Sequence, residues 1–162
     1  MRRKEREKDA AFAFRVLRDC DYATLATLNA DGTPYCIPIS PVSINNFIYF
    51  HCAAEGKKLD NINQNNAVCV SCVSRVKPVP EKFTTEFESA VIAGKCEMVP
   101  DEAEKIMALR ALCEKYASSN MDGFDAAIAR NLHRTCVYKV HITQITGKAN
   151  NMAPAPQAPP AG

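Results

Sequence analysis

The chain has 162 residues, of which 47% are hydrophobic, and a formal net charge of +2. This length fits one domain with a full hydrophobic core, and the small net charge argues against a nucleic-acid-binding protein. No apolar run is long enough to span a bilayer, so we expect no membrane segment.

Residues 1–8 carry charges of both signs and are not followed by the apolar stretch that a signal peptide needs. Eight cysteines are scattered along the chain. We therefore expect a cytoplasmic protein with reduced thiols. Cys69 and Cys72 have the spacing of a metal-binding pair. Residues three apart on a strand point to opposite faces, however, so we predict no metal site.

The first part of the chain changes from a helical to a strand period after residue 20. Phe12, Val16 and Leu17 would share one face of a helix over 9–20. Alternating residues then predict strands over 22–28, 35–40 and 47–51, with a turn at 29–32 after the first of them. We expect these three strands to form a meander. Pro38 has no N–H to donate, so it should lie at a sheet edge or a gap beside a ligand.

The second part of the chain contains longer strands and two further helices. Pro78 and Pro80 predict irregular structure over 76–86, and Gly94 predicts a bulge or bend. The other elements expected here are a short helix over 57–63, strands over 67–73, 87–99 and 136–145, and helices over 100–116 and 122–133.

Six strands with helical additions and no strand–helix–strand repeat predict a mainly β fold, a six-stranded antiparallel barrel. The barrel domain would span residues 1–149. Residues 150–162 are rich in alanine and proline, and we predict that they form a disordered tail.

The segment 51–63 carries the clearest chemical pattern in the sequence. A strand ends there, Gly56 makes a turn, and Lys57 and Lys58 open a helix. Backbone N–H groups at a helix start are unpaired and attract anions, and glycine allows a ligand to approach the backbone closely. The pattern favours a phosphate-binding site, although a solvated surface helix can begin in the same way.

Several separated motifs resemble the pyridoxamine 5′-phosphate oxidase-like FMN-binding split barrels. The order is an Asp-Gly turn, a strand with Pro38-Ile-Ser40, a strand ending in His51, and then Glu55-Gly-Lys-Lys58. The resemblance is greatest to the nitroimidazole-resistance branch and covers about residues 1–149. The motifs that carry it are 50–62, Glu81-Lys-Phe-Thr-Thr85, Phe87-Glu-Ser89 and Ile145-Thr-Gly-Lys148.

This resemblance implies a homodimer with FMN, or FAD, at the subunit interface. It places Lys57 and Lys58 on the flavin phosphate beside Gly56, and Glu88 and Ser89 on the flavin of the other subunit. His51 and Cys52 would lie along the ribityl chain and the ring. The strand that runs past the pyrimidine side of the ring would contribute Tyr35, Ile37, Pro38, Ile39 and Ser40.

The function implied by the resemblance is FMN-dependent reduction of small molecules such as nitroaromatic compounds. His51 would then be a proton donor to the substrate, or simply a residue of the barrel rim. The chain contains no tryptophan, which the vitamin B6 oxidases have in their C-terminal segment, so oxidation of pyridoxamine phosphate is not expected. Two alternatives remain open. One is a flavin-binding redox sensor or carrier without turnover, and the other is a haem protein with ligands among His51, His133 and His141.

Overall fold

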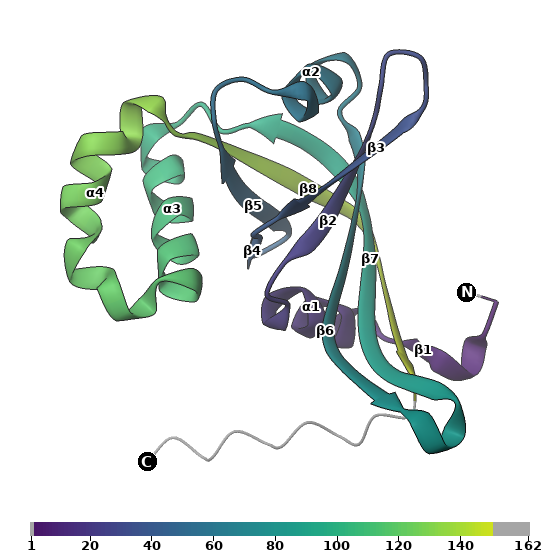
Figure 1. Cartoon of the computed structure of the whole chain (residues 1–162). Coiled ribbons are helices and arrows are strands. Elements are labelled where there is room, and N and C mark those ends of the chain that lie inside the picture. Colours follow the sequence, from purple (N-terminus) through teal and green to yellow (C-terminus); the bar gives the residue numbers. More distant parts are fainter. Residues whose placement is uncertain (1, 151–162) are drawn as a thin grey trace.

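The computed structural model describes residues 2–150, which form one antiparallel sheet with helices packed around it (Figure 1). The strands are β1 (Glu7–Lys8), β2 (Ala23–Leu28), β3 (Pro34–Ile39), β4 (Val42–Ile44), β5 (Phe47–Cys52), β6 (Ala67–Val79), β7 (Thr84–Met98) and β8 (Cys136–Asn150). The α-helices are α1 (Ala10–Asp19), α2 (Lys57–Gln64), α3 (Glu102–Tyr116) and α4 (Phe124–Asn131). Short 3-10 helices are η1 (Lys4–Arg6), η2 (Pro80–Lys82), η3 (Ser118–Gly123) and η4 (Leu132–Arg134).

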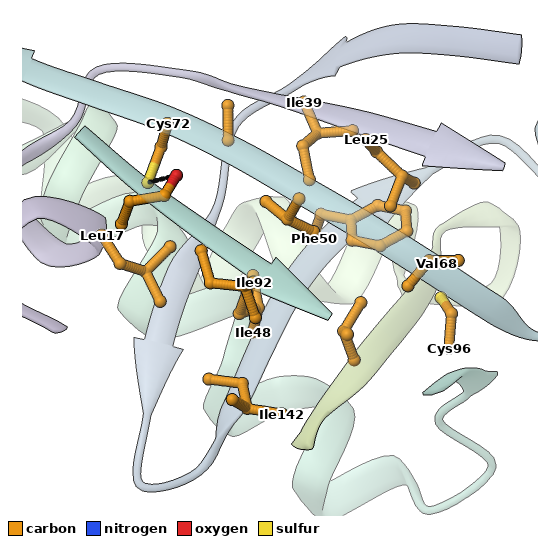
Figure 2. Close-up of a cluster of buried hydrophobic side chains, with 14 of the residues drawn as sticks. Leu17, Leu25, Ile39, Ile48, Phe50, Val68, Cys72, Ile92, Cys96 and Ile142 are labelled. Carbon is orange, nitrogen blue, oxygen red and sulfur yellow. Dashed lines mark hydrogen bonds between the residues drawn. The ribbon is translucent and has the colours of Figure 1, made fainter. Parts of the chain in front are cut away.

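The sheet has eight strands in the order β3-β2-β6-β7-β8-β5-β4, with β1 paired to β8 outside this path. It coils around one hydrophobic core, to which α1 and α2 also contribute. Figure 2 shows Leu17 of α1 in this core with Ile48 and Phe50 of β5 and Ile92 of β7. The mainly β fold of the split-barrel type is therefore confirmed, with helices added around the barrel.

A second hydrophobic cluster lies on the outer face of β5 and β8, under α3 and α4. Tyr49 of β5 belongs to this cluster and donates its hydroxyl hydrogen to Glu104 of α3 at 2.8 Å. Lys139 of β8 donates to the same carboxylate at 3.0 Å. This three-residue contact fixes α3 against the barrel wall.

All six predicted strands are present, but the expected meander is wrong. A meander would require β5 to pair with β3. Instead, β3 pairs with β2 at one end of the strand order, whereas β5 lies near the other end, between β8 and β4. After β3 the chain passes the buried Pro41 and enters β4, and a tight turn in which Asn45 has a φ of 53° joins β4 to β5. Alternation of apolar residues identifies a strand but not its partner, and two or three residues are too few to reveal β1 and β4.

The prediction of irregular structure over 76–86 is also wrong in part. β6 continues to Val79, and Pro78 lies in register with Thr85 of β7. β2 pairs with β6 between Cys69 and Cys72, so among the described strands β6 has a partner on one side only beyond that point. A proline is compatible with such an edge because its missing N–H faces no neighbouring strand. Pro38 lies on the edge strand β3, as predicted.

The end of the barrel domain extends slightly further than the sequence indicated. Ala149 and Asn150 complete β8 and are both buried, and the side chain of Asn150 donates to the carbonyl of Thr85 at 2.6 Å. Asn150 therefore belongs to the sheet and not to the tail. The remaining predicted tail, 151–162, lies outside the described residues.

Gly94 lies where two long strands approach each other most closely. The β7–β8 register shifts between Ala93 and Gly94, which confirms the predicted bulge. A Cβ atom at Gly94 would lie 2.5 Å from the carbonyl oxygen of His141 and 2.5 Å from Cγ1 of Val140.

We expect Gly94→Ala to lower the free energy of unfolding by about 1–3 kcal/mol in urea titrations, because overpacking forces the strands apart. The control is Gly32→Asn in the open β2–β3 turn, which should change stability little.

Candidate functional site

The start of α2 differs from the starts of α1 and α3. Asp9 and Asp101 cap those helices with their side chains, accepting backbone hydrogen bonds at 2.8 and 2.7 Å. The N-cap residue of α2 is Gly56, which makes no side-chain cap and has a φ of 147° and a ψ of 154°. This backbone conformation is accessible essentially to glycine alone. The first N–H groups of α2 thus point to a place where an external acceptor can bind.

The two lysines at this helix start extend to different neighbours. The ammonium group of Lys57 lies 5.0 Å from the ring centroid of Tyr35 on β3. Lys58 is close enough to Cys52 to favour its thiolate, although burial dominates and raises the pKa of that thiol. Neither lysine forms a salt bridge within residues 2–150. Asp31 and Asp60 line the same surface hollow as Lys57 without forming a salt bridge to it. Two cations that form no salt bridge, beside an uncapped helix start, suit a phosphate group.

The strand β3 brings a free sheet edge to the same region. Within residues 2–150 it pairs with β2 alone, so its other edge is available to a ligand. Tyr35, Ile37 and Ile39 alternate on the inner face, and Ile39 is buried in the barrel core. Pro38 is exposed on the outer face. Any contact of Ile39 with a cofactor would therefore come from its backbone.

The structure assigns His51 and Cys52 to opposite faces of β5. Cys52 packs against the barrel core, while the preceding Phe50 fills it. His51 faces the other way and, together with Ser40, lines a pocket of about 410 Å³ beneath α3 and α4. Successive side chains of a strand alternate, so these two residues cannot contact the same face of one ligand. Ser40 and His51 form one pair of the predicted site, and Tyr35 and Lys57 form another.

Glu88 lies beside α1, which is well separated from α2 in Figure 1. Its carboxylate is 4% exposed and accepts a hydrogen bond from Arg15 at 3.0 Å. Ser74 donates to it at 3.3 Å. Ser89 donates to the carbonyl of Lys148 at 3.5 Å. Within one chain these residues do not meet the lysines of α2, and their contact with the flavin of a second subunit stays a prediction.

The other candidate ligands do not form a cluster. His141 pairs in register with Phe47, four residues before His51 on β5, and its ring lies 5.2 Å from that of Phe47. Cys69 is exposed and Cys72 is buried, so the CxxC pair is split between faces as predicted. Within residues 2–150 no group of three metal-ligating side chains occurs. In that range no helix has the length and apolarity required to cross a membrane.

The sequence reasoning missed the pocket and the partner of Glu88. The spacing of Leu109, Leu112 and Cys113 is that of ordinary helix packing, yet these residues line the pocket as well. The sequence does contain a signal for a second apolar surface on α3, because apolar residues such as Met107 and Leu112 lie on different faces of this helix. Arg15 lies 73 residues before Glu88, and no local pattern connects them.

The Arg15–Glu88 pair gives a pH-dependent prediction. Burial opposes the charge on Glu88, but the hydrogen bonds and positive charges around it, those of Arg15 foremost, together lower the pKa of this carboxyl. A lowered pKa adds stability above the unfolded value of about 4.3, which is lost as pH falls through the folded value. We expect Glu88→Gln to lower the free energy of unfolding by about 1.5–3 kcal/mol at neutral pH. The difference in stability between the wild-type protein and this variant should become smaller below about pH 4. Denaturation measured at a series of acidic pH values tests this. A stability difference that stays the same in acid would contradict the pairing of Glu88 with Arg15. Glu81→Gln, at the exposed tip of the β6–β7 hairpin, is the control.

Solved structures share this architecture along most of their length. A candidate 5-nitroimidazole antibiotic resistance protein from Bacteroides thetaiotaomicron is 25% identical, with a TM-score of 0.71, covering 88% of this chain and 84% of that one. A FAD-binding protein from Mesorhizobium loti is 22% identical, with a TM-score of 0.68 and coverages of 90% and 98%. A FAD and haem binding protein from Mycobacterium smegmatis is 18% identical, with a TM-score of 0.76 and coverages of 94% and 77%.

No functionally curated protein matches the chain significantly. The family model described as pyridoxamine 5′-phosphate oxidase matches residues 9–149. This range contains the uncapped start of α2, the free edge of β3 and the pocket under α3 and α4. The chain therefore belongs to the pyridoxamine 5′-phosphate oxidase family.

Proposed function

We propose that this protein binds a flavin, with FMN as the first candidate, and acts as a flavin-dependent reductase of small molecules. The observation that carries the proposal is the start of α2. Gly56 leaves the helix uncapped, and Lys57 and Lys58 supply two cations that form no salt bridge within residues 2–150. A phosphate there would accept hydrogen bonds from the free backbone N–H groups and two charge-assisted hydrogen bonds from the lysines.

The residues around this helix start fit the rest of a flavin. Tyr35 already contacts Lys57, so the aromatic ring lies next to the proposed phosphate position. The free edge of β3 offers backbone donors and acceptors to a heterocycle that extends from there. A bound flavin would supply two-electron chemistry between a reduced nicotinamide and a second substrate. The names of the Mesorhizobium and Mycobacterium proteins, both FAD-binding, support a flavin and keep FAD open as the form.

His51 is the chain's own candidate proton donor. It is exposed at the end of β5, and its imidazole makes no hydrogen bond within the described part of the chain. An imidazole N–H group can donate its proton to a substrate that is being reduced. Ser40 lies in the same pocket and can orient such a substrate with its hydroxyl group.

The cofactor and the reaction can be tested in sequence. Purified protein should show flavin absorption bands, and chromatography of the released chromophore will distinguish FMN from FAD. Reduction by NADH or NADPH under anaerobic conditions, followed by addition of a nitroimidazole, should then regenerate the oxidised spectrum with turnover. Tight flavin retention without turnover under any donor would instead identify a sensor or carrier. A colourless protein that takes up no added flavin would refute the proposal.

The two lysines give the sharpest test of the phosphate position. Replacing Lys57 and Lys58 together by Ala should weaken FMN binding by several kcal/mol, because two charge-assisted contacts of about 1.5–3 kcal/mol each would be lost. Fluorescence titration with FMN measures this change. Riboflavin, which lacks the phosphate, should lose much less affinity. The matched control replaces the exposed Lys77 and Lys82 on the β6–β7 hairpin. Equal FMN affinity in both double variants would place the phosphate elsewhere.

A further inference from the structure

The pocket beneath α3 and α4 has a strongly divided lining. On the helix side, Leu109, Leu112, Phe124, Ile128 and Leu132 contribute apolar side chains. On the barrel side, Ser40 follows β3, and His51 is the last residue but one of β5. The helices form a hairpin beside the barrel, in which α3 lies on the side of β5 (Figure 1). The pocket is thus apolar in its body and polar at its barrel end.

Most polar side chains of the lining already have partners. Tyr116 donates its hydroxyl hydrogen to the carbonyl of Pro41 at 2.9 Å. Asn131 donates to Ala127 at 2.9 Å, and the hydroxyl of Thr135 donates to the carbonyl of Asn131 at 2.9 Å. Within residues 2–150, Ser40 and His51 make no side-chain hydrogen bond. Any ligand in this pocket would therefore find its hydrogen-bonding groups at the barrel end.

The lining also contains no Asp, Glu, Lys or Arg among the described residues. Burying a charged ligand group without an opposite charge is costly, so the pocket favours an uncharged molecule. Its volume of about 410 Å³ sets the size of that molecule. An apolar cavity of about 150 Å³ accommodates benzene, so this pocket has room for two or three aromatic rings.

We propose that this pocket binds the acceptor substrate, an uncharged aromatic molecule whose polar substituent contacts His51 and Ser40. The role as acceptor site depends on the proposed flavin function. The helical hairpin would then decide which molecules reach the flavin, because α3 and α4 provide nearly all of the apolar surface. Anionic compounds, including phosphorylated ones, would be disfavoured, because the helices that form the body of the pocket contribute no cationic side chain to it.

A pair of related probes tests the proposal by direct binding. N-phenyl-1-naphthylamine is uncharged and fluoresces strongly in apolar sites, and 8-anilino-1-naphthalenesulfonate carries a negative charge on a similar ring system. We expect the full chain to bind the uncharged probe at one site and the sulfonate much more weakly. Ala127→Trp would fill the pocket from α4 and raise the Kd of the uncharged probe by about tenfold or more. Ala129→Trp, on the same helix but outside the lining, is the matched control.

Flavin binding to each variant is measured by flavin fluorescence in parallel, and folding by circular dichroism. Flavin affinity should be the same in both tryptophan variants. Equal probe binding in the two variants, or equal binding of the two probes, would overturn the pocket assignment. Loss of flavin from folded Ala127→Trp would overturn it too, because the pocket would then hold the cofactor. If that variant does not fold, Cys113→Phe repeats the test from α3. The protein could bind both probes as expected and yet bind no flavin. That result would refute the proposed function but would still support the preference of the pocket for uncharged aromatic molecules.

Discussion

Strand β5 is packed on both faces, and the arrangement of the barrel, the helices and the pocket depends on this constraint. Ile48 and Phe50 point into the barrel core, while Tyr49 points into the second cluster under α3. A strand in this position cannot slip by one residue, because every side chain would move to the wrong core. The alternation continues past the last buried residue. It therefore directs His51 toward the helical hairpin and Cys52 toward the barrel.

The hairpin of α3 and α4 owes its position to a small polar contact within an apolar surface. Glu104 receives hydrogen bonds from Tyr49 and Lys139, which belong to neighbouring strands of the barrel wall. Lys115 and Tyr116, at the end of α3, both donate to the carbonyl of Pro41. These contacts fasten α3 to the barrel wall and to the segment after β3. The space left between the hairpin and the barrel rim is the pocket that Ser40 and His51 close.

The anion-binding end of the site has a different physical origin. It depends on a helix that starts without a cap and on two adjacent lysines, which are properties of a short continuous segment. α2 is held in place by Asn61, whose side chain donates to Thr27 and Asn29 of the β2–β3 hairpin at 3.0 Å. The proposed phosphate site and the proposed acceptor pocket are thus built from separate elements. A substitution in one can change its ligand without disturbing the other.

Local features of this protein could be predicted from the amino-acid order: six strands, the helices, the turn before β3, the bulge at Gly94 and the Gly56–Lys58 helix start. Each depends on residues near one another in the chain, whose periodicity or backbone preference is readable. Strand order, the continuation of β6 through Pro78 and the pairing of Arg15 with Glu88 became known only from the folded chain. The pocket belongs to this second group, since its lining comes from β5, α3, α4 and the segments after β3 and before β8. Contacts between distant segments depend on how the whole sheet coils, and no local pattern encodes them.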